Sequence, residues 1–314
     1  MAVNNDRMTI PAYMVPSYKT GVANRDGVEN NILFRVSGGI GDQICAEPTL
    51  RYALDTLKGC RISLEAEHPE LFEHLWFHSV VEKPDYSQFL VLDTMAQPTQ
   101  FFSEYVSHLL THCVDYPTIC SLRSQLPIRY KAVQTSFRRF GDTAVDVVIH
   151  PGKHWPSKTF PKDWWDQVIS QLVAAGITPV IIGANTDTNR VTVDVDTTGC
   201  VDLRNKTSIL ETIGLLRKTK VLLTNDSAPL HMAVSGEAWI GFISTAKHPD
   251  LVTHWRKDGW GWRMENHGLG GMWDLMDCCP NKMIGTTVEH VAEKTLRSWL
   301  PNPREYAAWA VSKI

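Results

Sequence analysis

The sequence lacks an excess of charge of either sign. Its 31 lysines and arginines nearly balance its 34 aspartates and glutamates, which gives a formal net charge of −3 with neutral histidines. A protein that holds a nucleic-acid backbone by overall charge needs a basic excess. The composition therefore argues against binding of polyanions by bulk charge and leaves only local basic loops as candidates.

The sequence also lacks paired cysteines of the kind that bind zinc or perform redox chemistry. Its seven cysteines are scattered, and none forms a Cys-x-x-Cys pair. This spacing argues against the common zinc sites and against a disulfide framework. A reduced compartment fits best, so we expect a cytoplasmic protein.

Long apolar runs are absent as well. The longest, residues 172–184, is interrupted by Gly176 and Pro179 and is shorter than the roughly 20 residues that a membrane-spanning helix needs. Residues 1–16 contain no basic segment followed by an apolar run, so we expect no signal peptide. We therefore expect no integral membrane segment.

What the sequence does contain is enough for about two domains, at roughly 150 residues per domain. Of its 314 residues, 43% are hydrophobic, as in ordinary globular proteins. We predict an extension over residues 1–30, a first Rossmann-like domain over 31–144, a second over 145–285, and a C-terminal helical segment over 286–314.

Apolar patterns predict alternating strands and helices in both halves. In the first half we expect strands over 32–36, 61–64 and 89–92, helices after Pro48 and over 69–77 and 101–112, and a link at Gly141-Asp142. In the second half we expect strands over 145–150, 178–183, 220–224 and 238–243, helices over 162–175, 208–218 and 288–299, and another beginning at Ser227. This alternation indicates α/β domains with parallel sheets. Ligands bind at the carboxyl ends of such strands, so we expect a cleft there between the two domains.

The first candidate site is a glycine loop after the first strand. Gly38, Gly39 and Gly41 would let backbone N–H groups approach an anionic or sugar ligand. The loop is not a dinucleotide fingerprint, because Ile44 stands where a third glycine would be needed. Asp42 at its end is either a helix cap or a general base, and both interpretations stay open.

The second candidate is the loop over 150–158. His150, Lys153, His154 and Lys158 surround a Pro-Gly turn just before a predicted helix. Cations near a helix start suit a diphosphate. The alternative is a solvated loop whose lysines bind nothing.

The third candidate is the segment over 224–231. Asp226 and Ser227 end a predicted strand, Pro229 lies in the first turn of the next helix, and His231 follows one turn in. This arrangement would direct N–H groups and His231 toward a ligand. The alternative is a well-capped helix with a packed histidine.

Taken in this order, the three segments resemble glycosyltransferase family 9, the ADP-heptose:lipopolysaccharide heptosyltransferases, whose GT-B fold has two Rossmann-like domains facing across a cleft. The resemblance covers about residues 31–60 and 145–245. The chain departs from the family pattern at Ala228, which replaces a glycine, and in a first domain that is short for the family.

The resemblance implies an inverting transfer of a sugar from a nucleotide-diphosphate donor. Asp42 matches the family's catalytic base, which takes the proton of the acceptor hydroxyl. Lys158 matches the lysine that neutralises the diphosphate. The remaining residues that match donor-binding positions are His150, Gly152, Thr207, Asp226, Ser227 and His231. The reaction implied needs no metal or other cofactor.

The acceptor and the class of activity stay open. A cell-envelope saccharide is the acceptor that the family implies. A hydroxylated pyrimidine base in DNA is the alternative, which the short first domain and the basic aromatic run over 254–263 favour and the net charge of −3 opposes. A non-catalytic nucleotide-sugar binding protein, an epimerase or a hydrolase would also fit these segments. The donor's sugar and nucleobase and the oligomeric state are likewise open.

Overall fold

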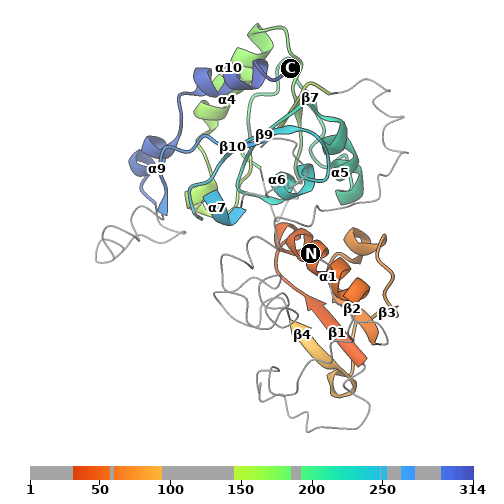
Figure 1. The fold of residues 1–314 in the computed structure, drawn as a ribbon. Helices are drawn as coiled ribbons and strands as arrows, with labels where there is room; N and C mark the ends of the chain where they lie inside the picture. The colour runs from red at the N-terminus through yellow and green to blue at the C-terminus, as the bar shows by residue number, and fades with distance from the viewer. Residues whose placement is uncertain are drawn as a thin grey trace, which may run out of the picture. The chain divides into compact units, whose positions relative to one another are not determined.

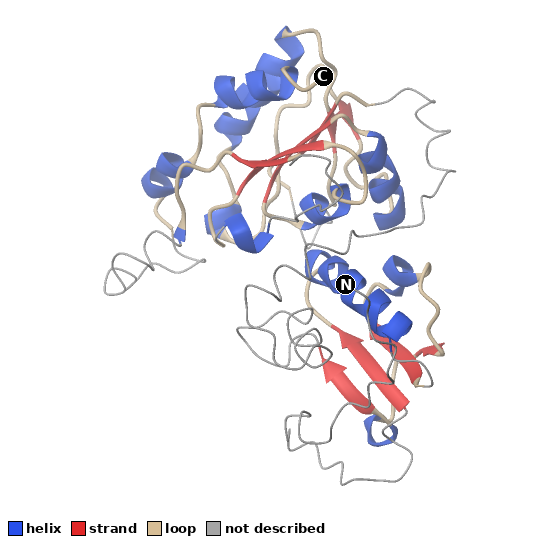
Figure 2. Ribbon diagram, viewed as in Figure 1, coloured by secondary structure: helices blue, strands red, loops and turns tan. Residues whose placement is uncertain are grey.

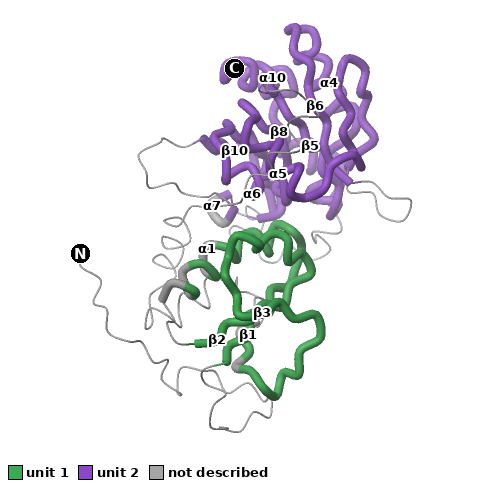
Figure 3. Tube along the Cα trace, turned by 90° about the vertical axis from the view of Figure 1, so that its right-hand side faces the viewer, with its two compact units in different colours: residues 1–131, 255–257 green, residues 132–254, 258–314 purple. Residues whose placement is uncertain are grey.

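The structure is a computed structural model, and it describes residues 31–56, 60–93, 145–184, 192–247, 249–252, 263–272 and 291–314. The chain divides into two compact units, residues 1–131 with 255–257 and residues 132–254 with 258–314 (Figure 3). The helix predicted over 101–112 and the link predicted at 141–142 lie outside the described residues. Over the part that is described, no helix combines the length and the apolar character needed to cross a membrane.

The described residues of the first unit form a parallel sheet in the order β3-β2-β1-β4 (Figure 1). Its strands are β1 (Asn31–Val36), β2 (Arg61–Ala66), β3 (Ser79–Val80) and β4 (Leu90–Asp93). The predicted strands over 32–36, 61–64 and 89–92 are confirmed within a residue or two at their ends. Ile32, Phe34 and Leu64 are fully or almost fully buried, which explains why apolar patterning found these strands.

The α-helix in the described part of this unit, α1 (Ile40–Thr56), begins earlier than predicted. We expected it after Pro48, but its first turn already includes Gly41 and Asp42. The N–H of Gln43 donates to the carbonyl of Gly39, which starts the helical hydrogen bonding. Pro48 removes one N–H donor from the helix interior, and in α1 the helix continues past it.

The helix predicted over 69–77 is wrong. The structure has only a short 3₁₀ turn over Pro69–Phe72 there, and a second such turn over Tyr86–Gln88. Leu71 and Phe72 are buried, but Trp76 is 93% exposed. The apolar stripe that a longer helix would bury therefore ends after one turn.

The described residues of the second unit form a parallel sheet in the order β10-β9-β8-β5-β6-β7. Its strands are β5 (Val147–His150), β6 (Val180–Ile181), β7 (Val201–Asp202), β8 (Val221–Asn225), β9 (Trp239–Ile243) and β10 (Met264–Asn266). Strands 5, 8 and 9 match the predicted ranges closely. β6 is shorter than the predicted 178–183, because Pro179 cannot donate to the ladder and Gly183 has a φ of +144°. β7 and β10 were not predicted.

Helices cover both faces of this sheet (Figure 2). They are α4 (Lys162–Ala174), α5 (Ile209–Lys218), α6 (Ala228–Ala233), α7 (Pro249–Val252), α9 (Glu293–Trp299) and α10 (Pro303–Val311). The predicted helices over 162–175, 208–218 and from Ser227 are confirmed. The last predicted helix corresponds to α9, while α10 was not predicted. α4 and α10 lie on one face, and α5 and α6 on the other (Figure 1).

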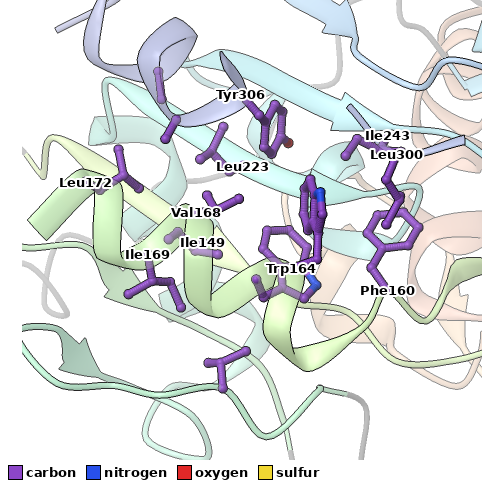
Figure 4. Packing of buried hydrophobic residues seen from close by; sticks show 14 of the residues in the cluster. Ile149, Phe160, Trp164, Val168, Ile169, Leu172, Leu223, Ile243, Leu300 and Tyr306 are labelled. Atoms are coloured by element: carbon purple, nitrogen blue, oxygen red, sulfur yellow. The ribbon is translucent and has the colours of Figure 1, made fainter. Parts of the chain in front are cut away.

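The core of the second unit lies between the sheet and the helices on its α4 side. Most of its buried side chains are aliphatic, and a group of aromatic rings packs among them, including Phe160, Trp164 and Tyr306 (Figure 4). Trp164 packs edge-on against Trp165 and contacts Tyr306, and Phe160 stacks on Trp165. The C-terminal residues belong to this core, since Tyr306 on α10 donates from its hydroxyl to the carbonyl of Gly241 at 2.7 Å. Burial raises the pKa of the Tyr306 phenol above its usual range.

Tyr306→Phe removes this buried hydrogen bond without changing the shape of the ring. We expect the free energy of unfolding of the second unit to fall by about 1–2 kcal/mol, because the buried Gly241 carbonyl loses its hydrogen-bond donor. Chemical denaturation followed by tryptophan fluorescence measures the change. Tyr86→Phe is the matched control, since the Tyr86 ring is 40% exposed and its hydroxyl donates to surface Glu65. Equal changes in the free energy of unfolding for the two variants would contradict the stabilising role of the Tyr306 hydroxyl.

Candidate functional site

The candidate donor site lies where the strand order of the second sheet reverses. β5 has β6 and then β7 on one side, and β8, β9 and β10 on the other. Parallel sheets bind ligands at the carboxyl ends of strands at such a switch point. His150 ends β5 beside Thr224 of β8, so the predicted segments over 150–158 and 224–231 meet at this point.

His150 is held from the α6 side of the sheet. Its Nδ1 lies 3.1 Å from Ser227 Oγ and 3.4 Å from Thr224 Oγ1. The ring is 5% exposed, and burial lowers the pKa of His150 to about 4. At neutral pH this histidine is therefore uncharged, and it offers hydrogen bonds rather than positive charge to the site.

Lys158 and Asp226 form a buried ion pair beside it. Lys158 Nζ lies 2.6 Å from Asp226 Oδ2 and also donates to the Asp226 carbonyl at 3.2 Å. Lys158 is 7% and Asp226 4% exposed. Burial alone would raise the pKa of Asp226, but the nearby Lys158, His231 and Lys247 outweigh it and lower that pKa. Lys158 is thus a fixed, desolvated cation, unlike exposed Lys153.

Trp155 and His231 lie beside this ion pair. The Lys158 ammonium lies 4.9 Å from the centre of the Trp155 ring, a distance at which a cation is attracted to the ring face. His231, on α6, is 8% exposed and contributes to the charge around Asp226. Ser227 occupies the N-cap position of α6, but its hydroxyl contacts His150 instead of capping the helix.

Thr207 lies apart from these residues in the sequence and in the sheet. It follows β7, the edge strand, and its Oγ1 lies 2.9 Å from Thr212 Oγ1 on α5. The start of α5 is fixed by a capping box between Ser208 and Glu211. The structure therefore brings His150, Gly152, Lys158, Asp226, Ser227 and His231 together and leaves Thr207 in a separate loop.

The first unit holds the predicted glycine loop and Asp42. Gly38 has a φ of +93°, and a Cβ there would lie 2.9 Å from the Asp42 Cβ, so a side chain at 38 would be strained. The N–H of Gly39 donates to Asp42 Oδ2 at 3.1 Å. Asp42 is therefore not the N-cap residue of α1 but lies inside its first turn, and its carboxylate reaches back to the Gly39 N–H.

Sequence reasoning gave no role to two buried amides, Gln43 and Asn225. Gln43 is fully buried; its Nε2 donates to the Gly38 carbonyl and its Oε1 accepts from the His68 N–H, both at 3.1 Å. Asn225, 1% exposed, donates to two carbonyls of the 150–158 loop. A signal existed, since each amide adjoins a predicted site aspartate, but an asparagine there is also typical of a turn.

Metal ligands do not gather in the described part of the chain. There, no group of three or more His, Cys, Asp or Glu side chains is arranged to hold a metal ion. Cys45, Cys60 and Cys200 are free thiols.

The sequence matches the model of glycosyltransferase family 9 (heptosyltransferase) over residues 69–238. No curated protein sequence matches the chain. Among solved structures, it is similar to a family 9 glycosyltransferase from Veillonella parvula DSM 2008, at 13% identity, with 89% of this chain and 97% of that chain covered and a TM-score of 0.52.

Two further structures are similar. Escherichia coli ADP-heptose lipopolysaccharide heptosyltransferase II shares 12% identity, with 90% of this chain and 98% of that chain covered and a TM-score of 0.57. The dodecameric iron-containing heptosyltransferase TibC of enterotoxigenic E. coli H10407, solved with ADP-D-beta-D-heptose, shares 15% identity, with coverages of 90% and 75% and a TM-score of 0.64. At these identities the likeness is one of fold, and it confirms the predicted GT-B fold.

The low pKa of His150 gives a pH dependence with a definite sign. The folded state favours the neutral ring, so its contribution to stability is complete above the ordinary pKa of 6.5 and disappears as the pH falls toward 4. We expect the free energy of unfolding to fall by about 3 kcal/mol as the pH falls from 6.5 to 4. Denaturation at pH 7 and pH 4.5, compared with His150→Asn, measures it. A His150 that titrates near pH 6.5 by NMR would contradict the prediction.

Proposed function

The chain belongs to glycosyltransferase family 9, the heptosyltransferase family, and on that premise we propose that it moves a sugar from a nucleotide-diphosphate sugar to an acceptor hydroxyl with inversion. The family match spans more than half of the chain. The observation that carries the proposal is the buried Lys158–Asp226 pair at the switch point of the second sheet.

The donor diphosphate binds, in this proposal, beside Lys158. A lysine ammonium has three N–H donors, and Asp226 receives two of them through Oδ2 and its carbonyl. The third is left for a phosphate oxygen, and a charge-assisted bond in a desolvated site is stronger than one in water. TibC, which shares the fold, was solved with ADP-D-beta-D-heptose, which supports an ADP-heptose-like donor here.

Asp42 acts as the general base. Its carboxylate takes the proton of the acceptor hydroxyl, the acceptor oxygen attacks the anomeric carbon, and the bond from that carbon to the diphosphate oxygen breaks. The bonding electrons leave with the nucleoside diphosphate, whose charge Lys158 stabilises. The Gly39 N–H fixes one carboxylate oxygen of Asp42. No metal or cofactor takes part in the proposed step.

A cell-envelope saccharide is the proposed acceptor, and the cytoplasm the proposed location. The alternative acceptor, a DNA base, is favoured by the short first domain and the basic aromatic run over 254–263 and opposed by the net charge of −3. Of that run, only Arg263 lies within the described residues. The Arg263 guanidinium bonds to the carbonyl of Glu237 and stacks near Trp239, at the amino end of β9. We propose the saccharide because it is the acceptor that the family implies, and a hydroxylated DNA base stays the alternative.

Asp42→Asn tests the base. The amide oxygen still accepts from Gly39, but it cannot take a proton, so we expect kcat to fall by about 10²–10⁴-fold while donor affinity is kept. Release of nucleoside diphosphate measures turnover, and calorimetry measures affinity. Asp194→Asn, at an 83% exposed side chain, is the control. Unchanged turnover would refute the base assignment, and donor binding without turnover by the native chain would indicate a binding protein.

Lys158→Met tests the donor site. We expect affinity for the nucleoside diphosphate to fall by about 10–100-fold, the worth of one hydrogen bond to a charged group. The single variant also leaves Asp226 buried and unpaired, which destabilises the fold. Lys158→Met/Asp226→Asn removes that charge, so stability should recover while affinity stays low. Lys162→Met, at an exposed lysine, is the control. Native affinity in the double variant would exclude Lys158 as a diphosphate ligand.

A further inference from the structure

We propose that Asn225 is a positioning residue, which clamps the loop from Gly152 to Lys158 and so fixes where the Lys158 ammonium meets the donor diphosphate. The inference rests on the donor site proposed above, but it concerns a residue that does not itself touch the donor. It follows from the hydrogen bonds, the burial and the packing of this side chain.

The Asn225 amide uses both of its N–H donors on this loop. Nδ2 donates to the Gly152 carbonyl at 3.1 Å and to the Lys158 carbonyl at 2.7 Å. A primary amide has two such hydrogens, so one side chain at the end of β8 fastens both ends of the loop. Oδ1 is buried and makes no hydrogen bond to the loop, and the Asn225 side chain also lies close enough to His150 to raise the pKa of that ring. The amide is therefore held to the loop through its nitrogen.

The backbone of Gly152 packs directly against the Asn225 amide. A Cβ at residue 152 would lie 2.3 Å from Asn225 Oδ1 and 2.6 Å from Nδ2. Real Cβ atoms do not approach other atoms so closely, and Asn225 is 1% exposed with no room to withdraw. Residue 152 therefore has to be glycine for the amide to reach its carbonyl.

Adjacent residues at the end of β8 hold the two ends of Lys158. Asn225 binds its carbonyl, and Asp226 binds its ammonium at 2.6 Å. From the end of β9, Thr245 donates through Oγ1 to the carbonyl of neighbouring Ser157. The loop is thus fastened to two strands of the sheet. A cation held in this way needs little reorganisation when charge develops on the leaving diphosphate.

The chemistry explains why the position suits asparagine. Aspartate has the same size, but its ionised carboxylate only accepts hydrogen bonds and would face two carbonyl oxygens. Alanine removes the clamp and relieves the crowding at Gly152. The two substitutions therefore release the loop for different reasons, and the proposal predicts the same functional result from both.

Asn225→Asp and Asn225→Ala test the clamp in the full-length chain. We expect at least a tenfold rise in the KM for the nucleotide sugar, and at least tenfold weaker binding of ADP, GDP or UDP, whichever the native chain binds. Amide hydrogen exchange over residues 152–158 should accelerate. A merely structural defect would lower the active fraction, and hence the apparent kcat, without changing KM.

The control is Asn266→Asp. Asn266 ends β10, and its Oδ1 accepts from the N–H groups of Ser244 and Gly268 at 3.0 and 3.2 Å. An aspartate keeps both bonds, so we expect native KM for this variant. The contrast separates loss of the donating amide at 225 from the general effect of adding a carboxylate near a strand end.

A double-mutant cycle gives a second test. Gly152→Ala alone should weaken nucleoside-diphosphate binding at least tenfold, because its Cβ meets the Asn225 amide. In the Asn225→Ala background the same change should cost less than about twofold, since the clash and the clamp are both gone. Additive effects of the two substitutions would overturn the proposal.

The same binding measurements distinguish a wrong donor site from a wrong role for Asn225. If Lys158→Met weakens binding of the nucleoside diphosphate while both Asn225 variants bind it as the native chain does, with unchanged exchange in the loop, the clamp is overturned and the donor site stands. If Lys158→Met and the Asn225 variants all bind natively, the donor site itself is wrong, and the clamp falls with it.

Discussion

A lysine ammonium and an aspartate carboxylate, 2.6 Å apart and both more than nine-tenths buried, are the interaction on which the second unit's site depends. Two charges can be buried only when they are paired and further hydrogen-bonded. The surroundings of Lys158 and Asp226 meet that condition: the Asp226 carbonyl accepts from the lysine, and Lys158, His231 and Lys247 together lower the pKa of the aspartate. The Lys158 ammonium is thereby held in a region that is largely shielded from solvent.

The parallel sheet explains how this pair is assembled. His150, Asn225 and Thr245 follow or end β5, β8 and β9, three neighbouring strands whose carboxyl ends meet at one edge of the sheet. The end of each strand contributes a different chemical group: a neutral histidine, an amide that donates to the loop over 150–158, and a hydroxyl that donates to the same loop. The core on the α4 side of the sheet, with Trp165 and Tyr306 fully buried, keeps these strand ends in place.

Much of this fold could be predicted from the sequence, because buried parallel strands such as Val147–His150 are short apolar runs bounded by turn residues. The helix predicted over 69–77 failed because Leu71 and Phe72 suggested an apolar stripe that the exposed Trp76 does not continue. The start of α1 was missed because Pro48 was taken as a boundary. The candidate residues came from family resemblance and motif order, whereas Asn225 and Gln43 act through specific backbone carbonyls that only the tertiary structure places beside them.

Sugar transfer from a nucleotide-sugar donor is the reaction on which the proposed roles of Lys158 and Asp42 depend. Its most direct test is to incubate the chain with a panel of nucleotide sugars, with and without saccharide acceptors, and to follow both nucleoside diphosphate release and the anomeric configuration of the product by proton NMR. The account predicts release that depends on the acceptor and a product of inverted configuration. Equal release without any acceptor, or a product with retained configuration, would contradict it.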